Sequence, residues 1–204
     1  MFLDKAEMVG DILEFAYGDS NLQQKTHGLP YGEINPAQGY VQQHGWAGGC
    51  FVLAEFGTIL LEWTTLSYET GEPRYGKHAT DVNAYLRSLP QPETGAWPNL
   101  FDPIGGRACS KAATFGGPAD RSVFILRDNF NSVFSFYEYI VKYFILSGQT
   151  DTKQLDWWKD IRTGLKKSLV KRNPNDKDMP VMMIELSSSG RQMNKMGHLG
   201  MFLD

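Results

Sequence analysis

The sequence predicts an all-α protein in which helices occur in sequential pairs joined by long Gly/Pro-rich loops. The first observation is apolar residues recurring every three or four positions, the spacing of a buried helix face. The second is that glycine or proline separates most of these segments. The segments with helical spacing are residues 3–16, 50–69, 73–89, 135–147 and 151–170.

The chain begins with a short amphipathic segment followed by a long loop. Residues 3–16 carry apolar side chains at near-helical spacing, and Gly18 ends the pattern. Residues 21–49 are polar and rich in glycine and proline, but they also hold aromatic residues such as Tyr31 and Trp46. We therefore expect a long ordered loop, a kind of segment that often carries function.

The strongest helical pattern covers residues 50–69. Its apolar positions are Leu53, Phe56, Leu60, Trp63 and Leu66. Gly71 ends this helix, and Pro73 suits the first turn of the next helix, which extends to residue 89. Two consecutive helices separated by so few residues predict a helical hairpin.

The second half of the chain repeats this arrangement. Residues 135–147 are strongly apolar and aromatic, and Asp151 is placed to cap a helix over residues 151–170. Residues 179–186 predict a short strand or extended segment, and residues 187–190 a loop. Helical hairpins serve enzymes, scaffolds and receptors alike, so this pattern alone does not identify a function.

Charge and composition exclude some classes of protein. The chain of 204 residues has 42% hydrophobic residues and a net charge of −3, which is typical of a globular domain and unlike a nucleic-acid-binding protein. The one local basic cluster lies near a predicted helix end, where cations are favourable, and we interpret it as solvated. Its members are Lys166, Lys167, Lys171 and Arg172.

The two cysteines and the N-terminal residues give information about the cellular compartment of the protein. Cys50 and Cys109 either pair or are both buried thiols. The N-terminus has no basic region followed by an apolar region, so it is not a signal peptide. No apolar run approaches the length of a membrane-spanning helix. Taken as written, the chain would stay in the cytosol.

Several separate motifs occur in one order along nearly the whole chain. They are Gly-Leu-Pro-Tyr at 28–31, the segment 46–62, Leu-Ser-Tyr-Glu-Thr-Gly-Glu-Pro at 66–73, Trp-Pro-Asn-Leu-Phe-Asp-Pro at 97–103, Phe-Gly-Gly-Pro-Ala-Asp at 115–120, Ser-Phe-Tyr-Glu-Tyr at 135–139, and Lys-Met-Gly-His-Leu at 195–199. In this order they resemble the class I α-1,2-mannosidases, glycoside hydrolase family 47.

The resemblance implies a fold and an activity. The family folds as an (α/α)7 barrel, a toroid of helical hairpins around a central pocket. Residues 1–204 would form a single partial catalytic domain, the middle of an incomplete barrel. The implied reaction is inverting hydrolysis of terminal α-1,2-linked mannose from high-mannose N-glycans. The implied setting is the membrane system of the endoplasmic reticulum and Golgi, or secretion.

The resemblance also implies roles for particular residues. Asp120 matches one of three catalytic acids arranged around a calcium ion, Ca2+, that also holds sugar hydroxyls. Glu55, Glu138 and His198 match positions that line the substrate pocket. The other two acids, both glutamates, and a calcium-binding threonine would fall before residue 1 and after residue 204, so this chain would supply no calcium ligands. His27, His44 and His78 match no motif, and we expect them on the surface or in loops.

Two departures from the family pattern stand out. Residues 121–134 interrupt the motif between Asp120 and Ser-Phe-Tyr-Glu-Tyr. They would separate Asp120 from the helix that normally positions it, and a catalytic carboxyl must be placed accurately against its substrate. They are a retained intron or gene-model error, or else a genuine loop insertion; a transcript lacking codons 121–134 would support the first. Met201 stands where the family often has a cysteine.

Three functions remain open at this point. The first is α-1,2-mannosidase activity, which requires mannose release. The second is a non-catalytic glycan-binding relative in quality control, and the third is a helical interaction scaffold. Because an incomplete barrel leaves apolar helix faces uncovered, we also expect self-association of the isolated chain.

Overall fold

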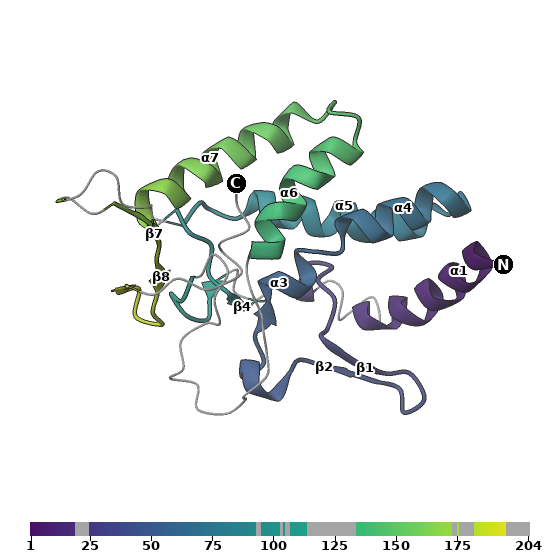
Figure 1. The fold of residues 1–204 in the computed structure, drawn as a ribbon. Coiled ribbons are helices and arrows are strands. Elements are labelled where there is room, and N and C mark those ends of the chain that lie inside the picture. The colour runs from purple at the N-terminus through teal and green to yellow at the C-terminus, as the bar shows by residue number, and fades with distance from the viewer. Residues whose placement is uncertain are drawn as a thin grey trace.

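The structure is a computed structural model, which describes residues 1–18, 25–92, 95–102, 104, 107–113, 134–172, 175 and 182–194. Helices form most of its regular structure (Figure 1). The helices are α1 (Phe2–Leu13), α3 (Leu53–Phe56), α4 (Leu60–Thr70), α5 (Pro73–Ser88), α6 (Phe134–Leu146) and α7 (Thr152–Ser168), with 3-10 turns η1 (Glu14–Tyr17) and η2 (Gly45–Ala47).

The two predicted helical hairpins are confirmed. Helices α4 and α5 pack together, and Gly71 ends α4 in the left-handed conformation at φ 75° while Pro73 opens α5. Helices α6 and α7 pack as a second pair (Figure 1). The Asp151 carboxylate caps α7 by accepting a hydrogen bond from the Gln154 N–H at 3.0 Å.

The single helix predicted over residues 50–69 is wrong, because the chain breaks between α3 and α4. At Gly57, an added Cβ would lie 2.6 Å from the Leu53 carbonyl oxygen and 2.7 Å from the Phe136 ring. The Thr58 hydroxyl donates to the Ala54 carbonyl at 2.7 Å, a side-chain bond that competes with helical pairing. The apolar spacing continues across the break, so periodicity could not show it.

The all-α prediction is correct for the helices but incomplete, since short strands occur in the loops. The strands are β1 (Glu33–Asn35), β2 (Tyr40–Gln42), β3 (Phe51–Val52), β4 (Leu100–Asp102), β5 (Arg107–Ala108), β6 (Val170–Lys171), β7 (Met182–Met183), β8 (Glu185–Leu186) and β9 (Gln192–Met193). All pair as antiparallel neighbours: β1 with β2, β4 with both β3 and β5, β6 with β7, and β8 with β9. This strand pairing gives backbone N–H and C=O groups of the loops hydrogen-bond partners that water would otherwise have to supply.

Two buried clusters hold these elements together. The larger one joins α5, α6 and α7 to the β3–β4–β5 sheet around Trp97, which is 1% exposed. The Trp97 backbone N–H donates to the Tyr137 hydroxyl at 3.0 Å, so a loop is fixed to α6. The smaller cluster joins η1, α4 and α5 through residues such as Tyr17, Trp63 and Tyr75.

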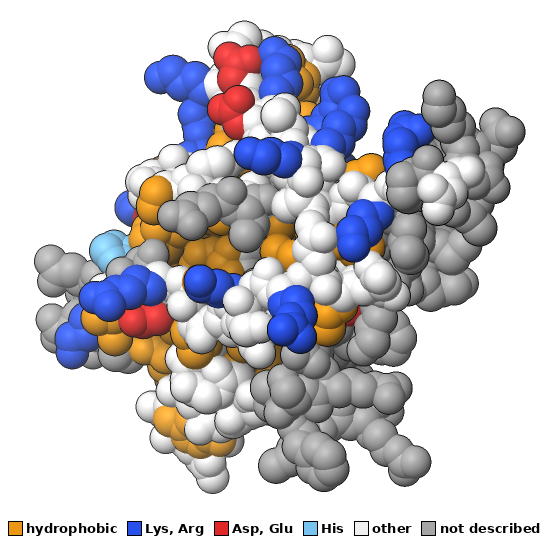
Figure 2. Space-filling view, turned by 90° about the vertical axis from the view of Figure 1, so that its left-hand side faces the viewer, with side chains coloured by type: hydrophobic (Ala, Val, Ile, Leu, Met, Phe, Trp, Pro, Cys, Tyr) orange, Lys and Arg blue, Asp and Glu red, His pale blue; other side chains and the backbone are white. Residues whose placement is uncertain are grey.

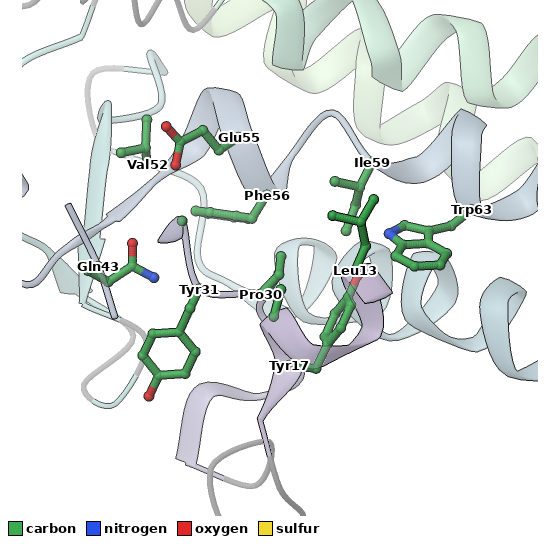
Figure 3. Close-up of a pocket in the computed structure, with 12 residues that line it drawn as sticks. Leu13, Tyr17, Pro30, Tyr31, Gln43, Val52, Glu55, Phe56, Ile59 and Trp63 are labelled. Atoms are coloured by element: carbon green, nitrogen blue, oxygen red, sulfur yellow. The ribbon is translucent and has the colours of Figure 1, made fainter. Parts of the chain in front are cut away.

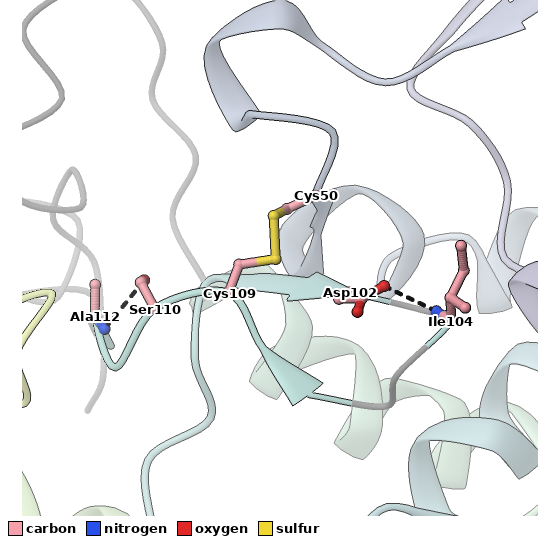
Figure 4. Close-up of a disulfide and its surroundings, with 6 residues drawn as sticks. All are labelled: Cys50, Asp102, Ile104, Cys109, Ser110 and Ala112. Atoms are coloured by element: carbon pink, nitrogen blue, oxygen red, sulfur yellow. Dashed lines mark hydrogen bonds between the residues drawn. A yellow bond between two sulfur atoms is a disulfide. The ribbon is translucent and has the colours of Figure 1, made fainter.

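Cys50 and Cys109 form a disulfide, which settles the question that the sequence left open (Figure 4). It joins residues 59 positions apart and lies beside the β3–β4–β5 sheet. A hydrogen bond next to this sheet joins the same two segments: the Leu53 N–H donates to the Asn99 carbonyl at 2.9 Å. The segment leading into α3 is therefore tied covalently and by hydrogen bonds to residues 99–109.

The basic cluster behaves as expected. Lys166, Lys167, Lys171 and Arg172 are all exposed, and Lys166 and Lys167 lie in the last turn of α7. Figure 2 views the side on which α7 ends and shows Lys and Arg side chains spread over that face among apolar and other groups. Of the interrupting segment 121–134, residues 121–133 lie outside the described residues, so its nature stays a prediction.

Removing the disulfide should destabilise the protein. Closing a loop of this length restricts the unfolded chain, and loss of such a bond typically costs about 2–4 kcal/mol. We expect the double variant Cys50→Ser/Cys109→Ser to unfold at lower temperature in calorimetry. A reducing agent should lower the transition of the parent protein and leave the double variant unchanged. Equal transitions for parent and variant would contradict a disulfide in the folded protein.

The contact between Gly95 and Gly164 reverses the usual effect of alanine in a helix. Gly164 lies in α7, and a Cβ added there would lie 2.5 Å from the Gly95 Cα. Alanine normally favours a helix over glycine by about 1 kcal/mol. We expect Gly164→Ala to destabilise instead, measured by denaturant unfolding, because the two backbones must separate. Gly45→Ala, where an added Cβ meets no atom within 4 Å, is the near-neutral control. A stabilised Gly164→Ala would contradict the close packing.

Apolar side chains on α1 should drive association of the isolated chain. Phe2 is 86% exposed and Ile12 is 49% exposed, and a groove of about 580 Å³ between α1 and α4 is lined mainly by apolar groups. We expect residues 1–204 to form dimers or larger species in analytical ultracentrifugation. The paired substitution Phe2→Ser/Ile12→Ser should shift the distribution toward monomer. A monodisperse monomer of the unsubstituted chain would contradict this prediction.

Candidate functional site

A pocket of about 210 Å³ lies where the β1–β2 hairpin, α3 and the end of α1 meet (Figure 3). It is smaller than the roughly 300 Å³ at which pockets for drug-sized ligands begin, so it suits a small ligand such as one sugar ring. Its lining residues are Leu13, Ala16, Tyr17, Pro30, Tyr31, Gly32, Gln43, Val52, Glu55, Phe56, Ile59 and Trp63.

The pocket has a polar end and an apolar end. Figure 3 shows the Glu55 carboxylate and the Gln43 amide at one end, and Leu13, Ile59 and Trp63 at the other. Phe56 lies between the two ends. A largely apolar wall with a few polar groups is the usual construction of a small-molecule site, and it matches a sugar, which has both C–H faces and hydroxyls.

Glu55 owes its position to the break in the helical segment. It lies in the single turn of α3, between strand β3 and the break at Gly57. Its side chain is 36% exposed, and burial raises its pKa, while the neighbouring His44 acts in the opposite direction. The Glu55 carboxylate is therefore half-buried and partly open to solvent, and it can accept hydrogen bonds from a ligand.

His44 links Glu55 to the hairpin. Its Nε2 lies 2.9 Å from Glu55 Oε1, and its Nδ1 lies 2.9 Å from Glu33 Oε1. The Gln42 amide also donates to Glu33 Oε2 at 2.6 Å. Burial alone would lower the pKa of His44, but the two carboxylates outweigh it and the pKa is raised. Hydrogen bonds from Gln42 and then His44 lower the pKa of Glu33.

Gly32 makes room for this bridge. A Cβ added there would lie 2.7 Å from His44 Nε2 and 3.0 Å from Glu55 Oε2, so any side chain would push the two groups apart. The hairpin register sets Glu33 opposite Gln42, which brings Gln43 and His44 directly after the strand to the pocket. A hairpin within the predicted long loop therefore builds the polar end of the pocket.

The Gln43 amide has no hydrogen-bond partner among the described residues, although both its nitrogen and its oxygen are buried. Leaving such a group unpaired typically costs about 1–3 kcal/mol. Gln43 lines the pocket with other atoms, but its amide nitrogen and oxygen are enclosed by protein, so a ligand in the pocket does not reach them in this conformation of the side chain.

The apolar end rests on a stacked aromatic group. The Tyr17 ring stacks on His78 with centroids 3.8 Å apart, and His78 Nε2 lies 3.1 Å from Glu14 Oε1. Burial lowers the pKa of His78, with Glu14 acting in the opposite direction. His78 is thus half-buried behind the pocket wall rather than free on the surface. His27, in contrast, is exposed in a loop, as expected.

The residues predicted from the family resemblance have different outcomes. Glu55 lines the pocket. Glu138 does not line it, and its carboxylate pairs with Lys142 Nζ at 2.6 Å on α6. Asp120 and His198 lie outside the described residues. The roles of Asp120, Glu138 and His198 therefore stay predictions.

Gln43 and His44 could not be identified as site residues from the sequence. His44 was expected on the surface or in a loop, yet its side chain is 20% exposed and fixed between two carboxylates. Glu33, His44 and Glu55 are spaced eleven residues apart, but they lie on β1, in a loop and on α3, so no single helix or strand places them together. Asn35-Pro36 and Gly39 mark the turn of the hairpin in the sequence, but a turn signal alone does not show which side chains the hairpin brings to Glu55.

The described residues do not fit a calcium site. Within the described ranges, no group of three or more His, Cys, Asp or Glu side chains is arranged to hold a metal ion. A calcium ion needs about six to eight oxygen ligands, and this part of the chain does not bring such a set together. Among the same residues, no helix is both long and apolar enough to cross a bilayer.

Known proteins resemble this chain in sequence and in fold. It is 28% identical over 203 residues to mannosyl-oligosaccharide α-1,2-mannosidase IA of Drosophila melanogaster, covering 99% of this chain and 27% of that protein. It is 31% identical over 176 residues to human mannosyl-oligosaccharide 1,2-α-mannosidase IB, covering 86% of this chain and 24% of that protein. The chain thus spans about a quarter of the length of these relatives.

A solved structure supports the fold. The α-1,2-mannosidase from Trichoderma reesei superposes with a TM-score of 0.72 at 21% identity, covering 97% of this chain and 36% of that protein. A sequence model described as glycosyl hydrolase family 47 matches residues 1–204. These matches bear out the resemblance carried by the ordered motifs, and the chain belongs to glycosyl hydrolase family 47.

Proposed function

We propose that this chain is part of a mannosyl-oligosaccharide 1,2-α-mannosidase, which removes terminal α-1,2-linked mannose from high-mannose N-glycans. The observation that carries the proposal is Glu55, which brings a half-buried carboxylate from the family-like segment 46–62 into a pocket suited to one sugar ring. Membership of the family and the names of the curated relatives support the same reaction.

The proposal includes a partial barrel. Two packed helical hairpins, together with the fold shared with the Trichoderma reesei enzyme, support placing residues 1–204 within an (α/α)7 toroid as part of one catalytic domain. The apolar groove between α1 and α4 is the kind of surface that neighbouring helices of such a toroid would cover.

The chemistry requires groups beyond the described pocket. Inverting hydrolysis needs one carboxylic acid to protonate the leaving oxygen and one carboxylate to activate water. In this proposal Asp120 is one catalytic acid, and Glu55, Glu138 and His198 contact the substrate. The remaining acids and the calcium ligands belong to segments other than those described. Glu55 fixes the sugar by accepting hydrogen bonds from its hydroxyls.

The disulfide supports a secretory setting. Disulfides form and persist in oxidising compartments and are rare in the cytosol. The Cys50–Cys109 bond therefore favours the endoplasmic reticulum, the Golgi or secretion over the cytosolic location that the N-terminus by itself suggested. N-glycans, the proposed substrates, occur in the same compartments.

Mannose release from a high-mannose N-glycan by the full-length protein is the test of this function. We expect Asp120→Asn to lower kcat by about 10²- to 10⁴-fold, the usual contribution of a general acid or base. We expect Glu55→Gln to lower kcat/KM by about 10- to 100-fold, because it weakens charge-assisted hydrogen bonds to the sugar. Proton NMR should show β-mannose as the first product, as inversion requires.

Glu69→Gln, an exposed carboxylate on α4, is the matched control and should keep full activity. Glycan binding without mannose release would identify the non-catalytic alternative instead. Absence of both binding and release would leave the scaffold alternative. Release of α-mannose as the first product would contradict inversion.

A further inference from the structure

Positive charge is unevenly distributed along this acidic chain. Residues 1–100 hold 5 Lys or Arg against 12 Asp or Glu, whereas residues 101–204 hold 15 Lys or Arg against 11 Asp or Glu. On the side where α7 ends, Lys and Arg side chains outnumber Asp and Glu side chains in the described part of the chain (Figure 2). The net charge of −3 therefore conceals a locally positive surface.

The β8–β9 hairpin brings cations from separate segments together. The Lys111 N–H donates to the Ser188 carbonyl at 3.1 Å, and a Cβ added at Gly190 would lie 3.2 Å from the Lys111 side chain. Lys111 therefore lies across the turn of the hairpin, directly before Arg191. Two cations that are far apart in the sequence are thus neighbours at this turn.

The end of α7 and strand β6 lie against the same hairpin. The Gln192 side-chain amide donates to the carbonyl of Ser168, the last residue of α7, at 3.1 Å. Lys171 Nζ on β6 donates to Asn194 Oδ1 at 2.9 Å. These contacts define a surface that we call the basic face, and all its members are exposed. They are Lys111, Lys166, Lys167, Lys171, Arg172 and Arg191.

No carboxylate neutralises the basic face among the described residues. The ion pairs of lysine and arginine in that part of the chain use Arg74, Lys77, Arg87, Lys142 and Lys159. The negative end of the α7 dipole favours the two lysines of its last turn, but the cations beside the hairpin turn come from other segments. Their mutual repulsion is relieved when an anionic partner binds.

We propose that the basic face binds a sulfated polysaccharide. Lysine and arginine donate charge-assisted hydrogen bonds to such anionic oxygens. None of the large exposed apolar side chains in the described ranges comes from the segments that form the basic face, although a membrane-binding surface or a helix-binding groove would use such side chains. The disulfide favours the secretory route, where sulfated polysaccharides are made and nucleic acids are not normal partners.

The basic face is separate from the pocket that contains Glu55, because none of its members lines that pocket. Its role does not depend on mannose release. The full-length protein should bind a size-defined heparin oligosaccharide at low ionic strength, and added salt should weaken this binding because exposed charges are screened.

Charge reversal on the basic face is the direct test. We expect Lys111→Glu/Arg191→Glu to lower heparin affinity about 10- to 100-fold in titration calorimetry, because two attractions become two repulsions. Lys166→Gln/Lys167→Gln removes two attractions only, and should lower affinity about 3- to 10-fold. Both variants should keep the parent unfolding temperature, because these side chains are exposed and form no ion pair with the described residues.

Lys5→Glu/Lys153→Glu is the matched control. It changes the net charge as much as the first variant, at exposed residues away from the basic face. Lys5 lies on α1, on the opposite side of the molecule from the end of α7 (Figure 1), and Lys153 lies about 20 Å along α7 from its last turn. Its heparin affinity should stay close to that of the parent protein.

Several results would overturn the proposal. They are no heparin binding at low ionic strength, an equal loss of affinity in the control, and equal affinity for fully desulfated heparin. Equal or tighter binding of phosphatidylserine vesicles or of polyglutamate would assign the basic face to a membrane or to an acidic peptide instead. Mannosidase activity is measured separately, so loss of the proposed function and loss of this site are distinguishable.

Discussion

The contact between the Phe136 ring and the backbone of Gly57 joins the helical part of the molecule to the part that bears the pocket. Phe136 is fully buried in α6, and a Cβ on Gly57 would approach its ring to 2.7 Å. The same ring packs against Trp97 and Trp157, with centroids 5.9 Å and 6.0 Å away. Because α3 ends where this contact begins, the direction in which Glu55 points depends on the packing of α6.

Sequence periodicity predicted the helices well and their interruptions poorly. Residues 73–89 and 151–170 have apolar positions on one face and clear start signals at Pro73 and Asp151, so their helices were correct within two residues. The break at Gly57 was invisible, because the apolar face continues through it and the ring that packs on Gly57 belongs to a residue more than seventy positions away. Short strands such as β3 were missed because two residues carry no alternation.

The site was predictable only where a motif carried it. Glu55 could be named from its segment, but its partner His44 and the pocket residue Gln43 come from a stretch that was predicted as a loop. Their role depends on the register of a hairpin and on the missing side chain at Gly32, which are features of tertiary structure. The physical signal for Gln43, a buried amide without a partner among the described residues, exists only once the chain is folded.

The pairing of β3 with β4 also orders events during synthesis. Phe51 pairs with Phe101, so the strand that enters α3 has no partner until the ribosome has released residues 100–102. The α4–α5 hairpin lies between them and has its own local contacts, so it can form while the rest is still being made. The residues that line the pocket all lie between 13 and 63 and so emerge before that strand, but the segment that carries Glu55 gains its backbone partners only when residues 99–102 arrive.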